Sequence, residues 1–157
     1  RWRPAWPGSD MNVRNYVRFE FFSIPENIAF ARSCVAAFAS QLDCTLEDIE
    51  EIKLVVSEAV SNCIIHGYEN QPNKMITVIA SIDHNGVLEI VVEDQGRGIE
   101  DLTRAMEATY SSDPTRMGLG FTFMKSFTDD MQVDTAPGKG TTVRLRRSFL
   151  KNEEALA

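Results

Sequence analysis

Cysteine is scarce in this chain, and the few cysteines form no recognisable pair. Cys34, Cys44 and Cys63 are the only ones among 157 residues, an odd number without CxxC spacing, which excludes a disulfide framework and a cysteine-based zinc motif. Cys34 and Cys63 fall within apolar helical patterns, where a free thiol behaves as a small hydrophobe. We therefore expect these two thiols to be reduced and buried, and the setting to be cytoplasmic.

Long apolar runs are also missing. No stretch approaches the ~18–20 residues needed to span a bilayer, and charged residues interrupt the segment after Met11, so it cannot form the apolar core of a signal peptide. We expect no membrane association. The hydrophobic fraction of 43% together with 25% charged residues is typical of a folded globular chain and excludes disorder.

Basic residues are in deficit, with 16 Lys and Arg against 23 Asp and Glu and a net charge of −7. Residues 1–10 contain both tryptophans, lack periodicity and directly precede Met11, so we interpret them as an added leader outside the native protein. Without Arg1, Arg3 and Asp10 the counts are 14 and 22, a net charge of −8. This charge argues against nucleic-acid binding and is compatible with a basic protein partner.

The remaining length predicts one domain over residues 11–150, because domains usually run to ~100–150 residues and bury a core without a metal or disulfide at that size. Residues 151–157 are expected to be a frayed tail. Alternating or β-branched runs predict strands at 17–21, 75–82, 87–94, 131–135 and 141–145. Three- and four-residue apolar spacing predicts helices at 25–42, 45–66, 101–107 and 121–127.

Short turns join neighbouring strands in this order, and Asn85-Gly86 is a strong hairpin signal. Thr45 and Asp48 form a variant capping box for the second helix. We therefore predict an α/β two-layer sandwich, in which a mixed, mainly antiparallel sheet carries helices on one face.

Glu58 and Asn62 form the first of four motifs with chemical potential. They are four residues apart in a predicted helix, so both side chains project from one face. A carboxylate beside an amide oxygen suits a hard cation, and the carboxylate can accept a proton from an attacking hydroxyl. An ordinary solvated helix face is the alternative interpretation.

The second motif is Asp94-x-Gly96-x-Gly98 at a predicted strand end. Glycines there permit positive φ and close approach of a ligand, and Asp94 can accept a hydrogen bond from an exocyclic amine such as that of adenine. An ordinary Asp-Gly turn is the alternative.

The third motif, Arg116 with Gly118 and Gly120, stands at the start of a predicted helix, where free N–H groups and a cation suit a phosphate. The fourth is Gly138-x-Gly140-Thr141, a turn into a strand. Taken singly, each is compatible with a simple glycine-rich turn.

The four motifs in this order resemble the ATP-binding family of gyrase, Hsp90, histidine kinases and MutL over residues 11–147. The stretches 57–68 and 118–124 are similar to the bacterial anti-sigma-factor serine kinases, most closely their sporulation branch. The resemblance implies the Bergerat ATP-binding fold, with ATP or ADP and Mg²⁺ bound. It also implies that Glu58 is the general base, Asn62 a Mg²⁺ ligand and Asp94 the residue that reads the adenine amine.

The same resemblance implies that Thr141 lies near Asp94 and helps to bind the base, while Gly96 and Gly98 shape the pocket floor. The backbone of Gly118 and Gly120 would contact the phosphates. Arg116 would contact the γ-phosphate, and residues from about 99 to 117 would form a lid.

Members of this kinase group bind a sigma factor of RNA polymerase, phosphorylate a serine of an anti-anti-sigma protein and form homodimers, and Arg32 is a candidate partner contact. One alternative is a nucleotide-dependent module that sequesters a sigma factor with little kinase activity, and another is the general-stress branch. A histidine kinase or a gyrase-like ATPase would need further domains.

Overall fold

The computed structural model describes residues 11–107 and 117–149. The expected leader, part of the expected lid with Arg116, and the expected tail lie outside these residues. Within the part of the chain that is described, no helix has the length and apolar character required to cross a bilayer.

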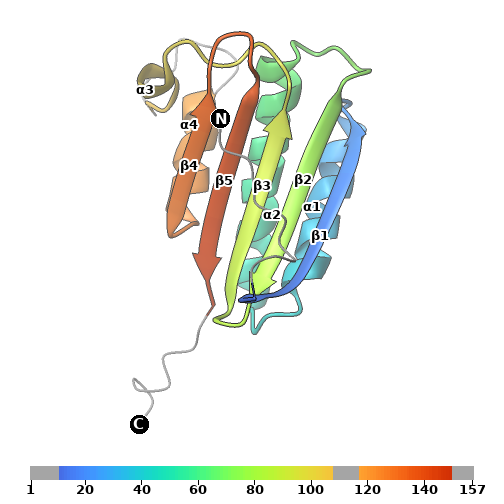
Figure 1. Cartoon of the computed structure of the whole chain (residues 1–157), viewed down its shortest axis with the longest axis vertical. Coiled ribbons are helices and arrows are strands. Elements are labelled where there is room, and N and C mark those ends of the chain that lie inside the picture. The colour runs from blue at the N-terminus through green and yellow to red at the C-terminus, as the bar shows by residue number, and fades with distance from the viewer. Residues whose placement is uncertain (1–10, 108–116, 150–157) are drawn as a thin grey trace.

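Five strands form one sheet in the order β1-β2-β3-β5-β4, and every pairing is antiparallel. The strands are β1 (Val13–Phe22), β2 (Met75–Asp83), β3 (Val87–Asp94), β4 (Asp130–Thr135) and β5 (Thr141–Ser148). The helices are α1 (Glu26–Ala39), α2 (Leu46–Asn62), α3 (Leu102–Ala105) and α4 (Met117–Ser126). Figure 1 shows α1, α2 and α4 behind the sheet, on one face, so the predicted two-layer sandwich is confirmed.

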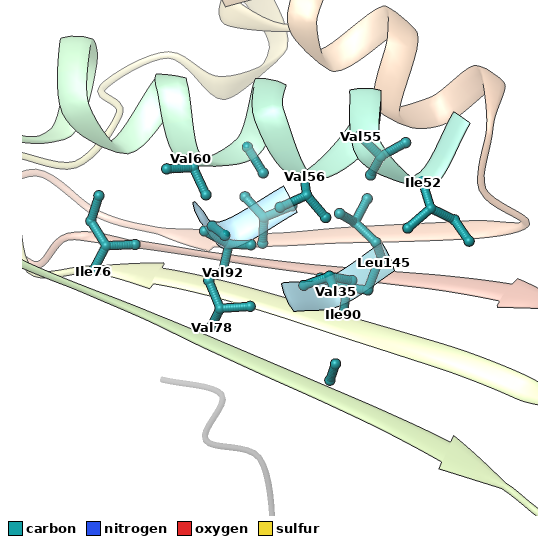
Figure 2. Packing of buried hydrophobic residues seen from close by; sticks show 14 of the residues in the cluster. Val35, Ile52, Val55, Val56, Val60, Ile76, Val78, Ile90, Val92 and Leu145 are labelled. Carbon is teal, nitrogen blue, oxygen red and sulfur yellow. The ribbon is translucent and has the colours of Figure 1, made fainter. Parts of the chain in front are cut away.

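The core lies between α2 and the sheet. Alternate residues of β2 and β3 point toward the helices because successive strand side chains face opposite ways. Figure 2 shows aliphatic side chains of α2 directed at those of the strands. The labelled members are Val35, Ile52, Val55, Val56, Val60, Ile76, Val78, Ile90, Val92 and Leu145. Burial of each such side chain contributes about 1.5–3 kcal/mol, so this layer fixes α2 over the sheet.

Two local predictions are confirmed in atomic detail. The Thr45 hydroxyl accepts from the Asp48 amide at 3.0 Å, and the Asp48 carboxylate accepts from the Thr45 amide at 2.9 Å, which completes the capping box. The β2–β3 hairpin turns at the predicted place, with Gly86 at φ +77°. The Asp83 carboxylate accepts from the Asn85 and Val87 amides at 2.9 Å each, and residues 84–86 form the loop between the two strands.

Other boundaries differ from the prediction. The second helix leaves regular α geometry at Asn62 and continues as a π turn, η2 (Cys63–Gly67). β5 runs to Ser148 rather than 145, because the charged side chains at its end are paired with acids of neighbouring elements. α4 begins at Met117, four residues earlier than predicted.

Candidate functional site

Three segments that are distant in sequence meet at one end of the sheet, at the top of Figure 1: η2, the end of β3 and the start of β5. Asp94 is the last residue of β3 and pairs with Thr141, the first residue of β5. Gly67, the last residue of η2, packs against the same carboxylate, since a Cβ on it would lie 2.8 Å from Asp94 Cγ. The structure therefore brings the second and fourth motifs together at the C-terminal end of α2.

Asp94 is a buried acid whose hydrogen-bond donors are all uncharged. It is 3% exposed, and its Oδ1 accepts from the Gly96 amide at 2.9 Å. The Thr141 amide and the Cys63 thiol also donate to the carboxylate. Burial is the largest influence and raises the pKa of Asp94 above its ordinary value, against the opposing effect of these donors. An acceptor held in this way suits an uncharged donor on a ligand, such as an amine on a ring.

The floor beside Asp94 is made of backbone that leaves no room for side chains. A Cβ at Gly96 would overlap the carbonyl oxygen of Gly67. Gly98 has φ +74°, and a Cβ there would overlap the carbonyl oxygen of Ala136. Both positions require glycine because the backbones approach so closely.

Glu58 and Asn62 lie on one face of α2, as predicted, and the first turn of α4 covers them. A Cβ on Gly120 would lie 2.9 Å from Glu58 Oε2 and 3.6 Å from both amide atoms of Asn62. The Asn62 amide nitrogen is buried and has no hydrogen-bond partner among the described residues. Gly118 and Gly120 both lie in the first turn of α4, and the first backbone N–H groups of a helix have no intrahelical acceptor.

A pocket joins these features. Its polar lining comes from Asn62, His66, Asp94 and Thr141, together with Cys63, Gly67 and Gly98. Its apolar lining is Ala59, Val92, Ile99, Phe121 and Val143. Apolar walls with a few fixed polar groups are typical of a small-molecule site, and here the buried acceptor Asp94 is one of those polar groups.

At the end of the pocket beneath α4, Asn62 is a candidate ligand for the ion of a Mg²⁺–nucleotide. In the described ranges, no group of three or more His, Cys, Asp or Glu side chains is arranged so that it could hold a metal ion. Mg²⁺ commonly takes one or two protein oxygens and completes its shell with substrate phosphates. The Asn62 amide, whose buried nitrogen is unsatisfied and whose oxygen lies close to Gly120 of α4, fits that arrangement.

Comparison with known proteins agrees with this geometry. Residues 21–147 match the histidine kinase-like ATPase domain family. The anti-sigma F factor of Thermoanaerobacter sp. (strain X514) is 48% identical over 139 residues, covering 87% of this chain and 96% of that protein. The anti-sigma F factor of Geobacillus kaustophilus is 43% identical over 143 residues, covering 90% of this chain and 97% of that protein. The chain belongs to the histidine kinase-like ATPase family, in its anti-sigma F factor group.

Solved structures share the fold of this ATPase family. The RsbU and RsbW domains of a Mycobacterium tuberculosis protein align with a TM-score of 0.61 at 18% identity, covering 85% of this chain and 32% of that one. A histidine kinase domain from Erythrobacter litoralis aligns with a TM-score of 0.53 at 18% identity, covering 78% of this chain and 59% of that one.

Four of the ten predicted site residues line the pocket: Asn62, Asp94, Gly98 and Thr141. Arg116 lies outside the described residues. Arg32 is exposed on α1 and does not line the pocket. Its suggested role as a partner contact therefore stays a prediction.

Sequence reasoning missed three residues in or next to this pocket. Cys34 and Cys63 were both expected to be buried; this is confirmed for Cys63, whereas Cys34 is only partly buried. The hydrogen bond of Cys63 to Asp94 was not foreseen. Tyr68 directs its hydroxyl at the backbone after Asp94. Thr135 Oγ1 lies 2.9 Å from both Thr141 Oγ1 and the Ile99 amide. Cys63 and Tyr68 are five residues apart, which is the hydrogen-bond spacing of a π turn. This spacing is the one sequence signal that links two of the three missed residues.

Proposed function

We propose that this protein is an anti-sigma factor and a protein serine kinase. It binds and inhibits a sporulation sigma factor of RNA polymerase, and it uses Mg-ATP to phosphorylate a serine of its anti-anti-sigma partner. The observation that carries the proposal is the placement of Glu58 and Asn62 beneath the first turn of α4, next to a pocket with Asp94 at its base. Relatives that match over most of the chain bear the name anti-sigma F factor.

In this proposal the base end of the nucleotide is recognised by Asp94, which accepts a hydrogen bond from the adenine amine. Thr141 holds the Asp94 carboxylate through its backbone amide. Gly96 and Gly98 keep the floor flat enough for a ring. The apolar walls exclude water, which strengthens the hydrogen bond to the buried carboxylate.

At the phosphate end, the N–H groups of Gly118 and Gly120 receive the phosphates at the positive end of a helix dipole. Asn62 would contribute an oxygen ligand to Mg²⁺, which when bound would offset phosphate charge during transfer. Glu58 takes the proton from the acceptor serine hydroxyl. Arg116 is assigned to the γ-phosphate.

We further propose that the protein acts in the cytoplasm as a homodimer and that Arg32 on α1 contacts a protein partner. The net charge of −7 is compatible with a basic partner and suits protein rather than nucleic-acid recognition.

The experiment is a phosphorylation assay with γ-labelled ATP, Mg²⁺ and candidate anti-anti-sigma proteins of the sporulation and general-stress systems. We expect labelled phosphoserine on the sporulation protein. Labelling of the stress protein alone would move the assignment to that branch. Tight sigma binding with no labelled product would instead support a sequestering module with little kinase activity.

A further inference from the structure

Tyr68 is a buried residue directly after the π turn that no step of the proposed mechanism uses. Its amide donates to the carbonyl oxygen of Cys63 at 2.9 Å and closes the turn. Its side chain is 6% exposed. Its hydroxyl donates to the carbonyl oxygen of Met75 at 2.5 Å and accepts from the Gln95 amide at 2.7 Å.

The two groups that this hydroxyl joins belong to neighbouring strands. The β2–β3 register pairs Ile76 with Asp94, so Met75 and Gln95 are the next residues that would face each other. In a continued antiparallel ladder, a carbonyl and an amide at this position bond directly. Here the Tyr68 hydroxyl stands between them and satisfies both, and the strand pairing ends at Asp94.

The backbone after Asp94 then docks on the π turn instead of on β2. We call residues 94–96 the recognition turn. The Gly96 amide bonds to the Asp94 carboxylate, and Gly96 packs against the carbonyl oxygen of Gly67. The Arg97 amide donates to the same carbonyl oxygen at 3.0 Å. The point where the ladder stops therefore sets where the Asp94 carboxylate stands in the pocket.

We infer that Tyr68 is a positioning residue for base recognition: its hydroxyl ends the β2–β3 ladder and holds the recognition turn, so that Asp94 faces the base before nucleotide arrives. This inference rests on the proposed function, because it requires Asp94 to read the adenine amine. Burial raises the pKa of Tyr68 to about 12, so the phenol keeps the proton that it donates to Met75 across the physiological range.

The test is Tyr68→Phe, which keeps the ring and removes only the hydroxyl. Binding of ADP and of inosine diphosphate, which lacks the exocyclic amine, is measured by calorimetry. Loss of one buried hydrogen-bond bridge is expected to weaken ADP binding by about fivefold or more. Inosine diphosphate binding should change less, so the preference for ADP falls. The matched control is Tyr16→Phe, the same deletion on β1, which should leave both affinities unchanged.

Equal weakening of both nucleotides, or no change in either, would overturn the inference, since a merely structural tyrosine leaves base preference intact. Failure of the unaltered protein to bind ADP would instead overturn the proposed function. Hydrogen exchange on the unaltered, nucleotide-free protein gives a readout that needs no variant. A protected Gln95 amide supports the preformed turn, whereas exchange as fast as that of the exposed loop residue Asn73 contradicts it.

Discussion

The two ends of α2 are built in opposite ways. At its N-terminal end, the capping box of Thr45 and Asp48 satisfies the free amides. The Arg147 guanidinium reaches back from β5 to Asp48 at 2.6 Å and to Glu51 at 2.9 Å. The acids Asp48 and Glu51 at this end are therefore paired with a cation from the sheet.

The C-terminal end lacks such pairing. The helix passes into a π turn, and Asp94 is buried beside it with uncharged donors and no cation among its described hydrogen-bond partners. The Asn62 amide nitrogen has no partner in the part of the chain that the structure describes. A buried charge and an unsatisfied amide cost stability, and under the proposed function this end keeps that hydrogen-bonding capacity for the nucleotide. We call the N-terminal end of α2 the stabilising end. We call its C-terminal end, where the proposed function places the nucleotide, the binding end.

The largest expected effect is at the binding end. Glu58→Ala should lower serine phosphorylation at least ~10²-fold, the usual scale of general-base catalysis, while ADP still binds. Glu50→Ala, on the exposed side of the same helix, is the control and should leave the rate unchanged. Serine phosphorylation by Glu58→Ala at the full rate would show that Glu58 is not the general base.

A second comparison tests how much the free energy of unfolding depends on the close approach of two backbone segments at Gly98. Gly98 and Gly138 share φ +74°, but a Cβ at Gly98 overlaps the carbonyl oxygen of Ala136, whereas nothing lies within 4 Å at Gly138. Gly98→Ala should lower the free energy of unfolding by roughly 3 kcal/mol, and Gly138→Ala by about 1–2 kcal/mol from backbone strain alone. Urea denaturation measures both, and equal losses would mean that the floor tolerates a side chain.

At the stabilising end, Arg147→Ala leaves Asp48 and Glu51 without their cation. These side chains keep 17–24% exposure, so the expected loss is about 2 kcal/mol, less than for a fully buried pair. Affinity for ADP should not change. Arg146→Ala, whose side chain is 41% exposed, should cost about 0.5 kcal/mol or less. Loss of ADP binding in Arg147→Ala would show that the two ends are coupled.

The smallest effect is a pH dependence. Because burial raises the folded-state pKa of Asp94, the folded protein holds a proton that the unfolded chain has already released. Its unfolding free energy therefore decreases as pH rises from the ordinary Asp value through the folded pKa. Asp94→Asn should remove this slope in urea denaturation curves measured across that window. An unchanged slope would assign the effect to another group.

The stabilising end was more predictable from sequence than the binding end. The capping box is a local pattern within four residues, and the strands follow from alternation. The ion pairs of Arg147 with Asp48 and Glu51 were not foreseen. The arginines after Leu145 resemble the end of a strand, and the two acids that pair with Arg147 lie about 100 positions earlier in the chain.

At the binding end, the motif order indicates Glu58, Asn62 and Asp94, and the structure brings the first two under α4 and the third to the base of the adjoining pocket. The contacts of Cys63 and Tyr68 were not predictable. They depend on a π turn, which apolar spacing at three and four residues does not reveal, and on where a strand ladder stops.

The most direct measurement is calorimetric titration of ADP into the unaltered protein and Asp94→Asn, with Asp130→Asn, an exposed acid on β4, as control. We predict binding to the unaltered protein and the control, and at least about tenfold weaker binding to Asp94→Asn, the scale of a hydrogen bond to a buried charge. Equal ADP affinity in all three proteins would contradict the assignment of this end of α2 to nucleotide recognition.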